Sequence, residues 1–196
     1  MQYDVWAITP STSATLLRAA ASFPAGAATL VTNDVSQNGC GYKILFTSAG
    51  NDSNRTFTIV GSAVGRLTDG LITEVVTGAN ASTATTTNFF SNVVSITISG
   101  NSAGNVSIGT TGSLALPRCR IKGCYYVGAS SAGSISINSN STSGTLLLKI
   151  PTPASSTAFA STFLIAPEGI LTSKGTANDF AIVTLDQVSQ VTLTCG

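Results

Sequence analysis

The sequence has no histidine, and only 9% of its 196 residues are charged, compared with about 25% in an average globular domain. Histidine is the usual general base of enzymes and the commonest protein ligand for metals. Its absence excludes Ser-His-Asp and Cys-His catalytic sites. Acid–base chemistry in this chain would have to rely mainly on carboxylates.

The eight carboxylates do not form a recognisable catalytic pattern. A glycosidase needs two carboxylates that converge on one sugar. Half of the acids here lie beside turn-forming residues, where solvated aspartates are common. These are Asp34, Asp52, Asp69 and Asp179. We therefore expect no enzymatic activity and no cofactor, and a hydrolase whose distant carboxylates meet in space is the competing hypothesis.

Two short motifs have some of the features of metal sites. The GNDSN stretch at 50–54 lacks the alternating acids and the distal Glu of an EF-hand, so we expect an Asx turn there. The CRIKGC stretch at 119–124 has the spacing of half a zinc site, but no second pair of ligands lies nearby. We therefore expect no bound metal.

The net charge is low and evenly balanced. Nine Lys and Arg residues against eight Asp and Glu residues give a formal charge of +1. Nucleic-acid-binding proteins usually show clustered positive charge, so we expect no nucleic-acid partner. No apolar run reaches 18 residues, so we expect no transmembrane helix. A nearly neutral surface suits a protein that assembles with other molecules.

The chain has four cysteines: Cys40, Cys119, Cys124 and Cys195. A chain of this length can bury a core and does not need disulfides to fold. Cys119 and Cys124 would face opposite sides of one strand and could not bridge without a bend. Cys195 could pair only if the C-terminus docked. Reduced structural thiols are the expectation, and the disulfide state is left open.

Short runs rich in Val, Ile and Thr predict β-strands. In the run TFTIVG, Phe57 and Ile59 fall on one face of a strand, and Thr56 and Thr58 fall on the other. The preceding run YKILFTSAG is separated from it by the turn-forming residues NDSN, so the two runs are predicted to form a hairpin. The later run VVSITISG alternates in the same way.

The strand pattern predicts an all-β fold of two small antiparallel β-sandwich or barrel domains with an N-terminal arm. Each half holds about six short strands, as such folds require. Residues 1–30 lack a clear period and are expected to form the arm, in which SATLLRAAASF is a candidate short helix. Residues 31–113 and 114–196 are expected to be the two domains, because Pro117 suits a linker or a strand start.

One basic cluster is a candidate partner contact. Arg118, Arg120 and Lys122 are two positions apart, which on a strand would place them in one positive stripe. The alternative is a solvated face, or an edge that its charges protect from aggregation. Trp6 is a further candidate contact, because aromatic residues are common in subunit contacts and in cores.

Residues Ser48 to Thr110 contain the motifs SAGND, TFTIVG, ITEVVTGAN, FFSNVVSITISG and GNVSIGT in this order. This string of turns and strands resembles a β domain found in structural proteins of tailed bacteriophages. The C-terminal stretch from FLIAPEGILTS to VTLTCG is similar, more weakly, to accessory virion proteins. The resemblance implies a role in the virion, on the capsid or in tail and fibre assemblies, and it brings no catalytic residues.

These observations lead to the expectation of a non-enzymatic virion protein. The leading hypothesis is a capsid-exterior decoration or cement protein that stabilises the head. The alternatives are a neck, tail or fibre-associated structural protein, and an adhesin that binds host glycan. The expected partners are the major capsid protein or other virion proteins, together with further copies of the chain in a homo-oligomer. The expected location is the virion, assembled in the cytoplasm of the bacterial host.

Overall fold

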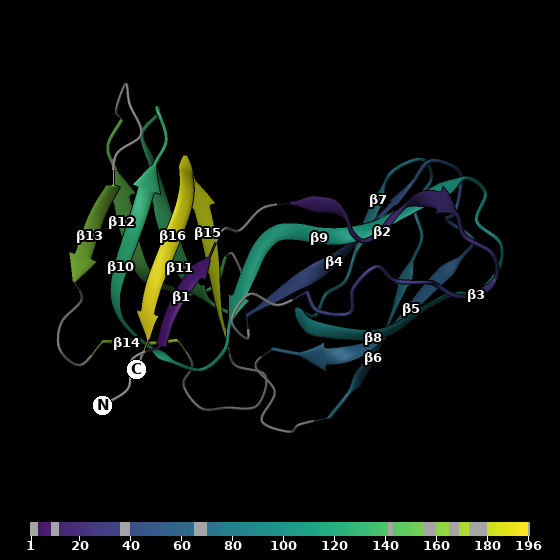
Figure 1. The fold of residues 1–196 in the computed structure, drawn as a ribbon, viewed down its shortest axis with the longest axis horizontal. Helices are drawn as coiled ribbons and strands as arrows, with labels where there is room; N and C mark the ends of the chain where they lie inside the picture. Colours follow the sequence, from purple (N-terminus) through teal and green to yellow (C-terminus); the bar gives the residue numbers. More distant parts are fainter. Residues whose placement is uncertain are drawn as a thin grey trace.

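The computed structural model is all-β, with strands and turns and no helix in the part of the chain that it describes (Figure 1). All strand pairs found there are antiparallel, so the predicted all-β antiparallel fold class is confirmed. No described segment could cross a membrane as a helix. The structure describes residues 4–8, 12–35, 40–64, 70–140, 143–154, 160–164, 169–172 and 180–195.

The strands within these described ranges are short, as the sequence predicts. In chain order they are β1 (Asp4–Ile8), β2 (Ser13–Ser22), β3 (Gly26–Ala27), β4 (Gly41–Ser48), β5 (Thr56–Ala63), β6 (Ile72–Thr77), β7 (Thr83–Thr85), β8 (Phe90–Ile98), β9 (Asn105–Leu116), β10 (Arg120–Gly128), β11 (Gly133–Ser139), β12 (Leu146–Thr152), β13 (Ala160–Leu164), β14 (Ile170–Leu171), β15 (Ala181–Asp186) and β16 (Val188–Cys195).

The lobe on the right of Figure 1 consists of two facing layers. Strands β2, β9, β4 and β7 pair in one layer, and β3, β8, β5 and β6 pair in the other. The layers meet at a corner where Tyr42 pairs with Phe90. Between them the rings of Phe46 and Phe57 stack with centroids 4.4 Å apart. The buried cluster comprises Leu17, Phe23, Val35, Ile44, Phe46, Phe57, Ile59, Ile72, Val76, Phe90, Val93, Ile96, Ile98, Val106 and Ile108.

The lobe on the left of Figure 1 also has two facing layers. Strands β1, β16, β10 and β13 form one of them, with β14 beside β10. Strands β12, β11 and β15 form the other, together with the C-terminal end of β9. Each large aliphatic side chain buried between such layers stabilises the fold by about 1.5–3 kcal/mol. The buried cluster comprises Cys40, Tyr42, Leu114, Leu116, Ile121, Cys124, Tyr126, Ile135, Ile137, Ile150, Ala181, Val183, Val191, Leu193 and Cys195.

Strand β9 belongs to both lobes. Val106 and Ile108 near its start are buried in one core, and Leu114 and Leu116 at its end are buried in the other. The boundary expected between residues 113 and 114 therefore falls inside a continuous strand. The division of the chain into two domains stays a prediction.

A small third cluster lies where the two lobes meet. Ala115 of β9 pairs with Ile182 of β15, and both pack against Val64 and Phe89. The ring of Phe180 lies 5.3 Å from that of Phe89, measured between centroids. The contact between the lobes is therefore apolar, as in a hydrophobic core.

Strands β4 and β5 do not form the predicted hairpin. β4 pairs with β9, β7 and β8, whereas β5 pairs with β6 and β8. The turn between them crosses from one layer to the other. Within it, the Ser53 N–H donates to Asn51 Oδ1 at 3.2 Å, which confirms the Asx turn. The hairpin prediction is wrong because alternation identifies a strand but not its neighbour in the sheet.

The expected N-terminal arm is corrected by the structure. Residues 4–8 pair with β16, residues 13–22 pair with β9, and residues 26–27 pair with β8. The candidate helix at 13–23 is also wrong, because this segment is extended as β2. Pairing with β9 gives its backbone hydrogen-bond partners, and this tertiary contact outweighs the weak local preference of its Ala and Leu residues for helix.

Strand β2 is mostly exposed and is held by a few anchors. Leu17 and Phe23 are fully buried. The Arg18 guanidinium donates to the carbonyl oxygens of Ser22 at 2.7 Å and of Val106 at 2.6 Å. It also lies 4.7 Å above the Phe23 ring centroid, within cation–π range. These contacts fasten the N-terminal segment to the lobe on the right of Figure 1.

We predict that Gly109→Ala loosens β2. An alanine Cβ at this position would lie 1.7 Å from the carbonyl oxygen of Ser13, so the two strands would have to separate. The expected cost is about 1–3 kcal/mol of unfolding free energy, as for an overpacked core site. Hydrogen exchange should accelerate in residues 13–22. The control is Gly70→Ala, because no atom lies within 4 Å of a Cβ built there. Equal stability of the two variants would contradict the prediction.

Candidate interaction surface

The outer surface of strands β5, β6 and β8 is an uncharged face. The inward positions of these strands hold buried side chains such as Phe57, Ile59 and Ile96, so the alternate positions point outward. The strand register aligns the outward side chains in rows across the three strands. This Thr/Val face consists of Thr56, Thr58, Val60, Thr73, Val75, Thr77, Ser95, Thr97 and Ser99.

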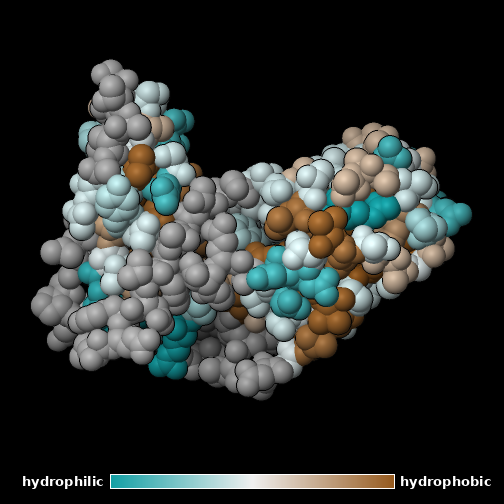
Figure 2. All heavy atoms as spheres, viewed as in Figure 1, coloured by the Kyte–Doolittle hydropathy of each residue, from teal (hydrophilic) through white to brown (hydrophobic). Residues whose placement is uncertain are grey.

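Apolar side chains are exposed on and beside the Thr/Val face. Val75 is 59% exposed, Leu71 just before β6 is 58% exposed, and Val94 on β8 is 48% exposed. Figure 2 shows hydrophobic residues beside pale and hydrophilic ones over the region where Figure 1 places β6 and β8. Burial of hydroxyl and methyl groups costs far less desolvation free energy than burial of charges. The face therefore suits contact with another protein.

One continuous sheet runs through both lobes, with β12 and β6 as its two edge strands. These two edges differ in how they are protected against pairing with another chain. Lys149 and Pro151 lie on edge strand β12, and both residue types discourage pairing with another chain. Edge strand β6 has neither. Its one charged residue, Glu74, accepts hydrogen bonds from the N–H groups of Thr87 and Asn88. An inward-directed charge also guards an edge, so the described part of β6 has one protecting residue where β12 has two.

The three predicted cationic contacts lie in the other lobe. Arg118 is exposed in the link before β10, and Arg120 is exposed at the first position of that strand. Lys122 is half-buried at a register shift in the pairing of β10 with β16. Arg120 and Lys122 alternate with the buried residues Ile121 and Gly123, so both lie on the outward side of β10. Arg120 and Lys122 also interact with other groups of the chain. Their role as partner contacts stays a prediction.

Trp6 is the predicted aromatic contact, and two tyrosines of strand β10 are further aromatic residues of the same layer. Trp6 is the register partner of Leu193 on β16, and its side chain lies outside the described part of the structure. Tyr126 is buried in the core, whereas Tyr125 is 40% exposed. Tyr125 is the one largely exposed aromatic among the described side chains. The described residues therefore offer a single aromatic surface for stacking.

Asp52 is a structural residue. It is fully buried, which corrects the expectation of a solvated turn aspartate. Its Oδ1 accepts the Ala103 N–H at 2.7 Å, and its own N–H donates to the Ala79 carbonyl at 3.0 Å. Asp52 thus ties together three turns at the end of the lobe. Asp34 is exposed, and Asp69 and Asp179 lie outside the described residues.

No three His, Cys, Asp or Glu side chains within the described ranges are grouped so that they could hold a metal ion. Two of the described acids instead accept hydrogen bonds from backbone N–H groups. Asp52 receives an N–H from the turn at Ala103, and Glu74 receives N–H groups from the turn at 87–88. Asp52 connects turns and Glu74 connects β6 to a turn, so both carboxylates have structural roles.

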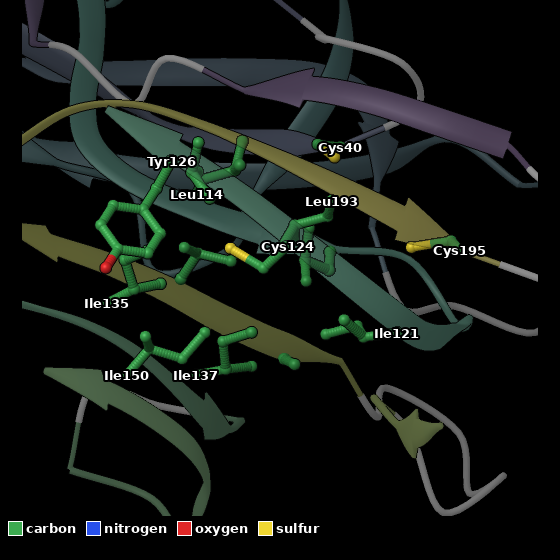
Figure 3. Packing of buried hydrophobic residues seen from close by; sticks show 14 of the residues in the cluster. Cys40, Leu114, Ile121, Cys124, Tyr126, Ile135, Ile137, Ile150, Leu193 and Cys195 are labelled. Carbon is green, nitrogen blue, oxygen red and sulfur yellow. The ribbon is translucent and has the colours of Figure 1, made fainter. Parts of the chain in front are cut away.

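The four cysteines are reduced in the structure, and two of them are in contact. The Sγ atoms of Cys119 and Cys195 lie 3.0 Å apart. Figure 3 shows Cys124 among the aliphatic side chains between the two layers, and Cys195 at the end of β16. The C-terminus is thus docked, because β16 pairs on both sides with β1 and β10.

Thr172 fixes the position of Cys119. Its side chain is buried, and its Oγ1 accepts the Cys119 N–H at 2.8 Å. The Thr172 N–H donates to the Cys119 carbonyl at 3.0 Å. Thr172 Oγ1 also lies 3.0 Å from the Pro117 carbonyl, to which it can donate. Thr172, the residue that follows β14, therefore binds the backbone on both sides of Cys119.

The thiols differ in acidity. Burial, and to a smaller extent the charge of Cys119, raises the pKa of Cys40 to about 12. Burial alone raises the pKa of Cys124 to about 12. The pKa of Cys119 is lowered, mainly by a hydrogen bond from Cys195 and also by one from Thr172, against an opposing effect of burial. Of these three, Cys119 is the thiol most readily ionised.

Sequence reasoning missed the Thr/Val face and the thiol pair. The alternation of Thr73, Val75 and Thr77 was a usable signal, because it places a valine among threonines on one side of a strand. The contact between Cys119 and Cys195 had no local signal, because 76 positions separate them.

Comparison with known proteins identifies no relative: no protein-family model, curated protein or solved structure matches the chain.

We predict that Asp52→Ala destabilises the fold by about 1–3 kcal/mol, because it removes a fully buried side chain and with it the acceptor of the part-buried Ala103 N–H. The matched variant Asp52→Asn keeps an oxygen in place and should cost less. Urea unfolding of both variants measures the difference. An alanine variant as stable as the asparagine variant would show that the hydrogen bond contributes little.

We predict that alkylation of the folded protein at pH 8 modifies Cys119 before Cys40 and Cys124. Alkylation needs the thiolate, and the pKa of each of the latter two is raised to about 12, so they stay protonated at this pH. Peptide mapping by mass spectrometry after timed quenching gives the order. All four cysteines should react in denaturant. Equal rates for Cys40 and Cys119 in the folded chain would contradict this order.

Proposed function

We propose that this chain is a non-enzymatic structural component of a bacteriophage virion, most specifically a decoration or cement protein on the exterior of the capsid that stabilises the head. The observation that carries the proposal is the Thr/Val face beside the lightly protected edge strand β6. Nine outward positions without a charge cover three paired strands of a two-layered lobe. The cores of protein interfaces are depleted of charged residues, as this face is.

The rest of the surface chemistry supports the same proposal. The chain has no histidine and few charges, and the described acids Asp52 and Glu74 bind backbone N–H groups of turns. The resemblance of residues 48–110 to a β domain of tailed-phage structural proteins supports a place in the virion. The partners proposed are the major capsid protein or other virion proteins, and further copies of this chain. The protein would be assembled in the bacterial cytoplasm.

A neck, tail or fibre-associated role uses the same surface and differs in copy number. A decoration protein covers the head lattice in many copies, whereas a neck or tail protein forms a small ring. The adhesin alternative would use exposed aromatic residues, of which Tyr125 is the one available among the described side chains. The Thr/Val face thus favours the structural role over glycan binding.

Cryo-electron microscopy of particles produced with this chain tests the proposal. We expect density for many copies on the outside of the head, with the β5–β6–β8 side against the shell or a neighbouring copy. A single ring at the neck or tail would favour the tail-associated role. Particles that lack the chain altogether, by both microscopy and mass spectrometry, would refute a virion function.

We predict that Val75→Lys lowers the occupancy of the chain on particles at least about tenfold, which corresponds to about 1.4 kcal/mol of binding free energy. The substitution places a charge in the middle of the Thr/Val face, and Val75 is 59% exposed, so the fold should tolerate it. The matched control is Ser131→Lys, at an exposed turn in the other lobe. Quantitative mass spectrometry of purified particles gives the occupancy. Unchanged occupancy of Val75→Lys would remove this face from the contact.

A further inference from the structure

We propose that Cys119 and Cys195 are a site of disulfide formation that locks the C-terminal strand β16 in place when the protein meets an oxidising environment. The inference does not depend on a virion role. The two sulfurs lie 3.0 Å apart, about 1 Å more than the bond length of about 2.05 Å in a disulfide. Formation of the bond therefore requires only a small movement of the two side chains.

The backbone already holds the two residues in register. Cys195 pairs with Ile121 in the ladder between β10 and β16, two positions along the chain from Cys119. Thr172 fixes the other side through reciprocal bonds, with its Oγ1 accepting the Cys119 N–H and its N–H donating to the Cys119 carbonyl. A pair held on both sides in this way loses little further freedom when it is joined.

The chemistry selects this pair over the other thiols. Disulfide exchange starts from a thiolate, and the ionised form of Cys119 is favoured mainly by a hydrogen bond from Cys195, whose sulfur lies 3.0 Å away. Cys119 is also partly exposed, whereas Cys40 and Cys124 are buried. Cys119 is thus the attacking residue, and Cys195, in contact with it, is the resolving residue.

The oxidant proposed is a small disulfide such as oxidised glutathione. The Cys119 thiolate attacks one sulfur of this molecule, which forms a mixed disulfide and releases one glutathione thiolate. Cys195 then loses its proton to that thiolate or to water and attacks Cys119 Sγ. The Cys119–Cys195 bond forms and the second glutathione thiolate leaves. The protein loses two electrons, and the oxidised glutathione gains two and becomes two thiols.

The Cys119–Cys195 disulfide would stabilise the N-terminal strand β1 as well as the C-terminal strand β16. Strand β16 lies between β1 and β10 in its layer, so the N-terminal strand is attached to the fold through β16. A link from Cys195 to the start of β10 would prevent the layer from separating at its C-terminal end. It would also close a long loop, and closure of long loops restricts the unfolded chain most strongly.

The test compares the full-length chain after treatment with oxidised glutathione and after treatment with dithiothreitol. We expect the oxidised chain to have two free thiols in denaturant instead of four, and a cross-linked peptide containing Cys119 and Cys195 in a non-reducing digest. The midpoint of thermal unfolding should be about 5–15 °C higher than in the reduced chain. Cys195→Ser should lose both the cross-link and the shift, whereas Cys124→Ala should retain them.

The wild-type measurements decide the matter even if a variant fails to fold. Four thiols remaining after oxidation of the folded chain would overturn the proposal. A bond that instead joins Cys119 to Cys40, or that involves Cys124, would overturn it as well. A specific Cys119–Cys195 bond that leaves the unfolding midpoint unchanged would refute the locking role.

Discussion

The pairing of β9 with partners in both lobes is the constraint on which the rest of the fold depends. Its first half carries Val106 and Ile108 into one core, and its end carries Leu114 and Leu116 into the other. Figure 1 shows it bending from one lobe to the other. Because one strand serves two cores, a shift of its register by one residue would turn the inward side chains of both lobes outward. The apolar cluster at Ala115 and Ile182 adds a third constraint where the lobes meet.

The same strand explains why the N-terminal segment is ordered. β9 pairs with β4 on one side, which leaves its other side for β2. The close approach at Gly109 and the contacts of Arg18 with carbonyl oxygens fit β2 into this place. Few residues of this segment are buried, so its hydrophobic residues show neither the two-residue period of a strand nor the 3.6-residue period of a helix. Its structure comes from its neighbours, which local sequence reasoning does not see.

Local properties were predictable from the sequence, and long-range ones were not. The alternation around Phe57 and Ile59 predicts both the strand and its buried face, because a strand in a two-layered fold must bury alternate residues. The Asx turn at Asn51 follows from the same local chemistry. The layer to which β4 or β5 belongs, the burial of Asp52 and the contact between Cys119 and Cys195 depend on residues far apart in the chain. No pattern within a short window contains that information.

The distribution of protection along the sheet edges bears on how the surface is used. A sheet edge in a lone soluble protein is normally guarded, and β12 has both Lys149 and Pro151 for this purpose. The edge at β6 relies on Glu74, whose carboxylate is already bound to the turn at 87–88 and is not directed along the edge. A lightly protected edge next to an uncharged Thr/Val face is an aggregation risk for a monomer, whereas in an assembly both features are covered by a neighbour. The asymmetry between the two edges therefore supports the proposal that the β6 side of the molecule is the one that contacts a partner.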